Sequence, residues 1–182
     1  PSISSAASDV YKRQVVDLSQ DKLNELESEF GSSNIEYILS TPESIAKAVA
    51  TSDMVVGAVY VVGKEAPKVV TTDMLQNMKP GTVMVDISID QGGCFESSRP
   101  TTHDDPTFLV NDVVHYCVTN MPGAVPLTAT EALNKATLPY ILELANKGIT
   151  RALDENNHLQ NGLNTLNGQA VHPGVQEALN KH

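Results

Sequence analysis

The 182-residue chain contains no tryptophan, and aromatic residues make up only 4% of it. A core built from this sequence must therefore be aliphatic, with Val, Ile, Leu, Ala and Met as its main components. No apolar run approaches the roughly 18 consecutive residues that a membrane-spanning helix needs. We therefore expect neither a membrane span nor a membrane partner.

Basic residues are also scarce, with 12 Lys and Arg against 22 Asp and Glu, which gives a formal net charge of −10. Proteins that bind nucleic acid neutralise phosphates with Lys and Arg, so this balance disfavours nucleic acid as a partner. The two cysteines, Cys94 and Cys117, form neither a CxxC pair nor a disulfide framework, and we interpret both as small buried apolar groups. Because no secretory pattern is present, we expect a soluble, cytoplasmic protein.

Residues 1–14 show neither a helical nor a strand period and run abruptly into residues 15–17, which have the character of a strand end. A transit peptide would explain the serines, but a single Arg and the acidic Asp9 fit that class poorly. We interpret the segment as a non-native leader and exclude it from the predicted fold.

From residue 15 onward, strand and helix patterns alternate. Apolar runs predict strands over residues 35–39, 54–62, 83–89 and 113–119, and the Val-rich runs at 54–62 and 83–89 are typical of strands covered on both faces. Amphipathic patterns predict helices over residues 21–30, 41–50 and 71–78. Strands separated by helices imply right-handed crossovers and a parallel sheet, so the predicted class is α/β, an incomplete doubly wound sheet of the Rossmann type.

The pattern changes after Pro126. Residues 130–145 predict a long helix that Pro139 kinks, residues 156–168 predict polar turns, and residues 173–179 predict a short final helix. This part contains too little strand to extend the sheet. We therefore assign residues 15–125 to a partial α/β domain, and residues 126–182 to a connecting helix and part of a second domain.

Ligands of a doubly wound sheet bind beyond the carboxyl ends of its strands. Asp17, Val59, Asp90 and Asn120 each follow a predicted strand, which makes them candidate site residues. A dinucleotide-binding fold usually opens with a strand, a GxGxxG loop and a helix, with an acid about 20 residues further on. Asp17 suits the place of that acid, but no GxGxxG precedes it, so from the residues alone a helix-capping role for Asp17 stays open.

The run VDISIDQGGCFE over residues 85–96 resembles the signature loop of the alanine dehydrogenases, a family that includes the alpha chain of nicotinamide nucleotide transhydrogenases. Residues 57–71, 98–108, 115–126 and 134–148 resemble the same family in order and spacing, so the resemblance covers residues 15 to about 179. The transhydrogenase chain usually lacks the Asp-Gln-Gly-Gly form of this loop. The sequence therefore resembles alanine dehydrogenase more closely.

The resemblance implies NAD as the cofactor and a reversible oxidative deamination of L-alanine to pyruvate and ammonia, carried out by a homohexamer. It also implies that this chain is an N-terminally truncated fragment, without the first NAD strand, the glycine loop and the segment that holds the substrate and the catalytic His. We therefore expect the fragment to be inactive by itself. Two alternatives stay open: a transhydrogenase alpha-chain nucleotide domain, and a non-catalytic nucleotide-binding fragment.

At the adenosine end, the resemblance implies that Asp17 accepts hydrogen bonds from the ribose hydroxyls, and its charge favours NAD over NADP. Lys22 resembles a family residue near the adenosine, and Ser40 ends a strand where its hydroxyl can meet the adenine side of the cofactor. Val59 and Tyr60 wall the cofactor. Each has a simpler alternative: a solvated helix charge for Lys22, a neighbour of a helix cap for Ser40, and strand core for Val59.

At the nicotinamide end, Asp90 is the predicted catalytic residue, since the family's aspartate takes part in proton handling. A carboxylate there can stabilise an iminium and position water or ammonia. The other residues that the resemblance places against the cofactor are Ile87, Ser88, Ile89, Arg99, Val118, Thr119, Asn120 and Met121. The run His103-Asp104-Asp105 has poor geometry for ligating a metal, so we predict no metal site.

Overall fold

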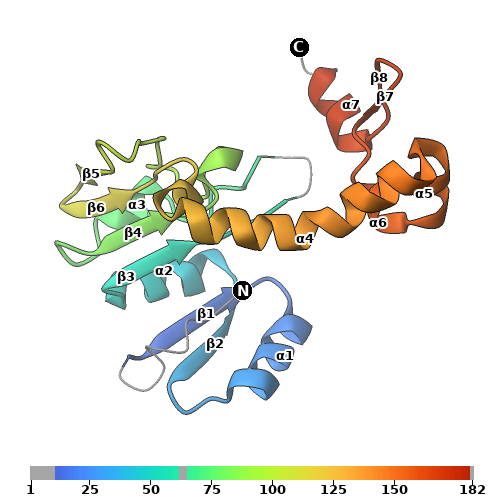
Figure 1. Ribbon diagram of the computed structural model, residues 1–182. Coiled ribbons are helices and arrows are strands. Elements are labelled where there is room, and N and C mark those ends of the chain that lie inside the picture. The colour runs from blue at the N-terminus through green and yellow to red at the C-terminus, as the bar shows by residue number, and fades with distance from the viewer. Residues whose placement is uncertain (1–10, 62–64, 181–182) are drawn as a thin grey trace.

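The computed structural model describes residues 11–61 and 65–180 and has mixed α/β architecture (Figure 1). Its elements are β1 (Arg13–Asp17), α1 (Gln20–Phe30), β2 (Ile35–Leu39), α2 (Pro42–Thr51), β3 (Met54–Gly57), α3 (Thr72–Leu75), β4 (Val83–Asp86), η2 (Ile89–Gln91), β5 (Thr107–Val110), β6 (Val113–Tyr116), η3 (Met121–Ala124), α4 (Pro126–Lys147), α5 (Ile149–Glu155), α6 (Asn157–Asn161), β7 (Thr165–Leu166), β8 (Gln169–Ala170) and α7 (Pro173–Leu179). Residues 1–10 of the predicted leader and residue 62 of a predicted strand lie outside the described residues.

The first unit is a parallel pair of strands, β1 and β2, joined by α1. Leu23 and Leu26 lie on the buried face of α1, and the side chain of Ser19 caps its first turn by accepting from the N–H of Lys22. The strand before Asp17 is longer than predicted, because it begins at Arg13 and so includes two residues that we had excluded as leader.

A second, four-stranded sheet has the order β3-β4-β6-β5. Strands β3, β4 and β6 are parallel, which confirms the predicted sheet type, and its core is aliphatic apart from Phe95. The predicted strands over 54–62, 83–89 and 113–119 are too long, since the ladders end at Gly57, Asp86 and Tyr116. The prediction that 54–62 is covered on both faces is also wrong in this chain, where Met54 is 61% and Val56 53% exposed.

Strand β5 was not predicted from the sequence. It pairs antiparallel with β6 through the two-residue turn Asn111-Asp112, whose φ angles of 50° and 61° are both positive. Two-residue hairpin loops favour this left-handed conformation, and Asn and Asp tolerate it better than other residues that carry a side chain. The hairpin places an antiparallel strand at one edge of the parallel sheet.

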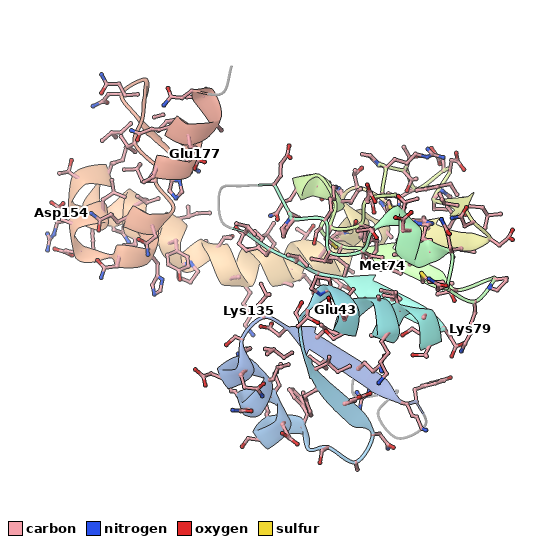
Figure 2. The ribbon with its side chains drawn as sticks, turned by 180° about the vertical axis from the view of Figure 1, so that it is seen from behind. Glu43, Met74, Lys79, Lys135, Asp154 and Glu177 are labelled. Atoms are coloured by element: carbon pink, nitrogen blue, oxygen red, sulfur yellow. The ribbon has the colours of Figure 1, made fainter. Side chains whose placement is uncertain are left out.

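The C-terminal part is a long helix followed by a small helical unit, which α4 separates from the sheets (Figure 1; Asp154 and Glu177 in Figure 2 lie in this unit). Helix α4 begins at Pro126, four residues earlier than predicted, and continues through Pro139 to Lys147; none of its residues is buried. Helix α6 lies in a stretch that we predicted as turns, whereas α7 matches its prediction. In the described part of the chain, no helix has the length and apolar character to cross a membrane.

Candidate functional site

The carboxyl ends of β3, β4 and β6 meet at one edge of the four-stranded sheet. After β4, the N–H of Ile87 donates to the carbonyl of Gly57 at 2.8 Å, and the Ser88 hydroxyl donates to the carbonyl of Val59 at 2.7 Å. The N–H of Asn120, beyond β6, donates to Oδ2 of Asp90 at 3.5 Å. The structure therefore brings together Val59, Asp90 and Asn120, as expected for the ends of parallel strands.

Asp90 lies at the crest of a tight turn. The N–H groups of Gln91 and Gly93 both donate to the carbonyl of Ser88, at 2.9 and 3.0 Å, and the turn ends in Gly92 and Gly93 with φ of 88° and 75°. Glycine adopts this left-handed backbone without steric cost. The turn leaves the Asp90 side chain exposed to solvent, where it can meet a ligand.

Around this turn the predicted cofactor residues have different surroundings. Ile87 is 54% exposed and Tyr60 is 66% exposed, so both present apolar surface. Ser88 and Ile89 are buried and Val59 is half-buried. The contact of Ser88 with Val59, beyond β3, and the burial of Ile89 indicate that these two side chains support the turn.

Asp86, which the sequence analysis did not identify as a site residue, binds this loop from the buried side. Its carboxylate is fully buried and accepts hydrogen bonds from the N–H groups of Ser88, Cys94 and Phe95 at 3.0, 2.9 and 3.3 Å, and from the Ser98 hydroxyl at 2.5 Å. Buried polar groups are costly unless they are hydrogen-bonded, and these donors satisfy both carboxylate oxygens. The sequence feature that could have pointed to Asp86 is its place as an acidic residue at the end of a Val-rich strand.

Gly93 passes close to this carboxylate. A Cβ atom at Gly93 would lie 2.9 Å from Oδ2 of Asp86 and 3.0 Å from Cβ of Ser98, in a backbone conformation that side chains rarely adopt. The position therefore requires glycine both for its φ and for the close approach to Asp86. The second glycine of the Asp-Gln-Gly-Gly run is thus explained by packing within the loop.

At the tip of β6, Asn120 has a left-handed backbone with φ of 53°. Its carbonyl accepts from the N–H of Gly123 at 2.8 Å and from Nε2–H of His103 at 3.1 Å. Val118 is buried, Thr119 is half-buried with its N–H on the carbonyl of Thr101, and Met121 opens η3. Among the described residues, no group of three or more His, Cys, Asp or Glu side chains is arranged to hold a metal ion.

Arg99 belongs to a stack of side chains beside the site. Its guanidinium lies 4.1 Å from the ring centroid of Phe108, which stacks on the buried His115 at 4.9 Å. The Nε2 atom of His115 lies 2.7 Å from the Ser97 hydroxyl oxygen, and burial lowers the pKa of His115 below its ordinary value. These contacts connect Arg99 to β5 and β6 and give it a cation–π role.

Both cysteines are free and buried. Burial, together with the negative charge of Asp86, raises the pKa of the Cys94 thiol to about 11, and burial also raises the pKa of Cys117. A reactive cysteine needs a thiolate near neutral pH. The interpretation of Cys94 and Cys117 as small buried groups is therefore confirmed.

The residues predicted for the adenosine end lie on the separate β1–β2 pair. Oδ1 of Asp17 accepts from the N–H of Ser19 at 2.8 Å, and the N–H of Ser40 donates to the carbonyl of Asp17 at 2.8 Å. Lys22 forms an ion pair with Glu25 at 2.7 Å, and this pairing raises the pKa of Lys22. Asp17 and Ser40 are thus adjacent, and Lys22 has the exposed helix pairing that was its simpler alternative.

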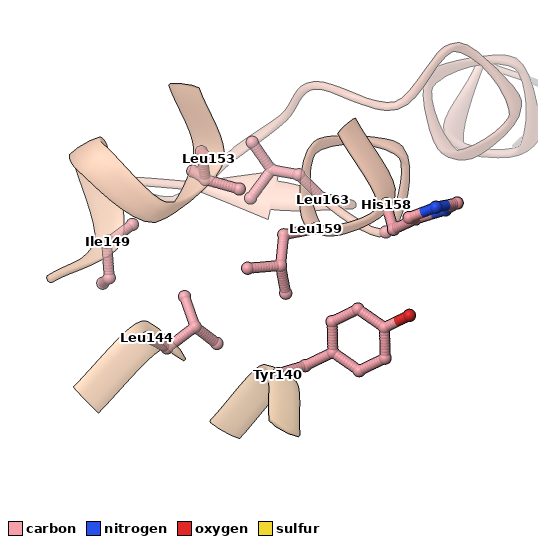
Figure 3. A pocket seen from close by; sticks show the side chains of 8 residues that line it. Tyr140, Leu144, Ile149, Leu153, His158, Leu159 and Leu163 are labelled. Carbon is pink, nitrogen blue, oxygen red and sulfur yellow. The ribbon is translucent and has the colours of Figure 1, made fainter. Parts of the chain in front are cut away.

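An open apolar pocket of about 540 Å³ lies elsewhere, between α4, α5 and α6 (Figure 3). Leucine side chains dominate its lining, with Tyr140 and His158 at one side. It contains none of the predicted site residues and no acid. The polar groups at the strand ends and this apolar pocket therefore lie in different parts of the molecule.

Known proteins are similar to this chain in both sequence and fold. The family model described as "Alanine dehydrogenase/PNT, C-terminal domain" matches residues 2–173. The alanine dehydrogenase of Halomonas elongata is 49% identical over 164 residues, which make up 90% of this chain and 44% of that protein. The alanine dehydrogenase of Staphylococcus saprophyticus is 52% identical over 167 residues, 91% of this chain and 45% of that protein.

Solved structures agree with these relatives. An L-alanine dehydrogenase superposes with a TM-score of 0.80 and 45% identity, over 93% of this chain and 46% of that one. A transhydrogenase from Sinorhizobium meliloti is more distant, with a TM-score of 0.65 and 22% identity over 88% of this chain and 42% of that one, and this likeness concerns the fold. The chain spans less than half the length of the curated relatives it matches.

Proposed function

This chain belongs to the alanine dehydrogenase/PNT family, matching its C-terminal domain, and on that premise we propose that it forms part of an NAD-dependent L-alanine dehydrogenase. The reaction proposed for the whole protein converts L-alanine, water and NAD to pyruvate, ammonia and NADH, and runs in both directions. A homohexamer in the cytoplasm is the assembly and location that we propose with it. The transhydrogenase alternative is disfavoured because its match is more distant.

The observation that carries the proposal is the meeting of Asp90 and Asn120 at the tips of β4 and β6, 3.5 Å apart through the Asn120 N–H. The groups gathered there suit the nicotinamide half of a dinucleotide: exposed apolar surface from Ile87 for the ring, and a carboxylate and amide for its polar edge. Ligands of open α/β sheets bind at this edge.

Bound NAD would supply the hydride acceptor for the Cα–H bond of alanine. Asp90 then has two tasks that an exposed carboxylate can perform. Its negative charge stabilises the positive charge that develops on the substrate nitrogen, and its oxygens accept a proton from the water that attacks the iminium carbon. Asn120, whose N–H contacts Asp90, keeps one of these oxygens oriented.

Asp17 supports NAD in preference to NADP. One of its carboxylate oxygens accepts from Ser19, and the adjacent Ser40 lies beside it at the carboxyl end of the β1–β2 pair. A carboxylate at this place accepts hydrogen bonds from ribose hydroxyls and repels a 2′-phosphate. The proposed adenosine and nicotinamide ends thus lie beyond the strand ends of the two sheets.

The test is a calorimetric titration of the chain with NAD and with NADP, with Asp17→Asn as the variant and the exposed Asp21→Asn as its control. We expect NAD to bind more tightly than NADP, and Asp17→Asn to reduce this discrimination by roughly fivefold, because Asp17 is a partly exposed charge. Asp21→Asn should leave the discrimination between NAD and NADP unchanged. Failure to bind either nucleotide, or discrimination that Asp17→Asn does not alter, would overturn the assignment.

A further inference from the structure

The side chain of Lys68 binds the Gly92-Gly93 turn beside the candidate site. Its ammonium donates to the carbonyl oxygens of both Gly92 and Gly93, the latter at 2.8 Å. Neither the resemblance nor the strand-tip rule pointed to Lys68, which lies in an irregular segment between β3 and α3. The interaction joins residues 24 and 25 positions apart in the sequence, so it is a tertiary contact.

The two carbonyls share one side-chain donor. Both glycines are left-handed, with φ of 88° and 75°, and the carbonyl oxygens of both accept from the Lys68 ammonium. Two adjacent oxygens are matched by one ammonium group, which has three N–H donors. A hydrogen bond from a charged donor is about twice as strong as one between neutral groups.

The backbone on either side of Lys68 also binds this loop. The N–H of Ala66 donates to the carbonyl of Gln91 at 2.9 Å, and the N–H of Val69 donates to the carbonyl of Cys94 at 2.8 Å. These two bonds bracket the carbonyls that Lys68 holds. Residues 66–69 and 91–94 therefore run side by side, with Lys68 completing the set of contacts across the glycines.

Two further hydrogen bonds extend this attachment. The N–H of Glu96 donates to the carbonyl of Val70 at 2.9 Å, and the Glu96 carboxylate accepts from the N–H of Thr72 at 2.6 Å. That hydrogen bond lowers the pKa of Glu96, so the contact is present at neutral pH. The loop is thus attached along its C-terminal side, whereas the Asp90 side chain at its crest makes, among the residues that the structure describes, only the long contact with Asn120.

We propose that Lys68 is a positioning residue for Asp90: by binding the carbonyls of Gly92 and Gly93 it fixes the turn that presents the Asp90 carboxylate to the nicotinamide half of the nucleotide. The proposal rests on the proposed function for the identity of the ligand. Its structural part, that Lys68 orders the turn, stands on the contacts within this chain.

The first test measures the order of the turn without any ligand. In Lys68→Met, the amides of Gly92 and Gly93 should exchange with solvent roughly threefold to tenfold faster, as expected for loss of a charged hydrogen bond at a partly exposed site. Amides in β4 and β6 should be unchanged. The control is Lys79→Met (Lys79 is labelled in Figure 2). This change removes the ion pair between Lys79 and Asp53, which lies at the N-terminal ends of β3 and β4 and not at the loop after β4.

The second test separates positioning from a general loss of structure. Lys68→Met should weaken binding of NADH severalfold while leaving ADP-ribose, which lacks the nicotinamide, unaffected. Unchanged exchange at the glycines, faster exchange throughout the sheet, or equal weakening of both ligands would each overturn the proposal. If the unsubstituted chain binds neither ligand, the proposed function fails, and the exchange result alone still decides whether Lys68 fixes the turn.

Discussion

Asp86 and Asp90 are four residues apart and have opposite surroundings. Asp86 is fully buried under the loop and accepts from several backbone N–H groups, whereas Asp90 is exposed at the crest. One carboxylate therefore holds the loop together and the other is free to meet a ligand. The two acids of the VDISID run should respond differently to the same substitution.

Asp86→Asn should destabilise the chain by about 2 kcal/mol or more, because the amide nitrogen cannot accept from buried donors that then lose their partner. Asp90→Asn should change the free energy of unfolding by less than about 0.5 kcal/mol, as surface substitutions usually do. Urea unfolding of both variants measures this contrast. Equal destabilisation by the two changes would show that Asp86 does not hold the loop.

His115 makes stability depend on pH. Burial lowers its pKa in the folded chain below the ordinary 6.5, so below that pH the unfolded chain binds more protons than the folded one. Stability should therefore fall as the pH drops from 6.5 toward the lowered pKa. His115→Gln should flatten this part of the pH profile in urea unfolding, while the same change at the exposed His158 should not.

The strand-end rule predicted which residues lie close together. Asp90 and Asn120 each follow a predicted strand, and the structure places them in contact, while their roles toward a ligand stay predictions. Asp86 and Lys68 were missed because their importance depends on where the loop between Asp86 and Ser98 folds back. Hydrogen bonds across such a loop leave no spacing pattern in the sequence.

At the scale of elements, local signals were reliable where a cap or a turn defines them. Helix α2 (Pro42–Thr51) matches the helix predicted over residues 41–50 to within one residue at each end, and Thr41 and Ser44 form a reciprocal capping box at its start. Strand ends were less predictable, because the apolar run after Gly57 continues although its backbone leaves the ladder. The β3–β4 ladder ends at the pair Gly57 and Asp86, so the end of β3 depends on its pairing with β4 and not on the local sequence.

The β5–β6 turn offers a test of the missed hairpin. Asp112 has φ of 61°, so Asp112→Val should cost about 1 kcal/mol through backbone strain, whereas Asp112→Gly should be neutral or slightly stabilising. Thermal or urea unfolding of the two variants measures the difference. If Val and Gly at this position gave equal stability, the left-handed turn would be refuted.

At the scale of the whole molecule, the strands form separate sheets. Within the described residues, β1 pairs only with β2, and β3 pairs only with β4, so each sheet has an edge strand with an unpaired side. The sequence predicted parallel strands but not this separation, because the order of strands in a sheet depends on long-range pairing. The exposed Met54 and Val56 lie on such an edge strand.

An exposed apolar edge strand favours association between copies. The double variant Met54→Lys/Val56→Lys should reduce self-association measured by light scattering, although it brings the net charge of −10 closer to zero, which by itself promotes association. The matched control places two lysines at the exposed Leu127 and Leu133 of α4, away from the sheet edge. Equal effects of the two variants would argue against an edge-specific contact.

The most direct measurement is an amide NMR titration of the chain with NADH, which reports every backbone position at once. The largest shifts should fall on Asp90 and Asn120 and on the residues after β3, with a second group around Asp17 and Ser40. Shifts confined to the pocket between α4 and α6, or scattered without relation to the strand ends, would contradict a nucleotide site at the carboxyl edge of these sheets.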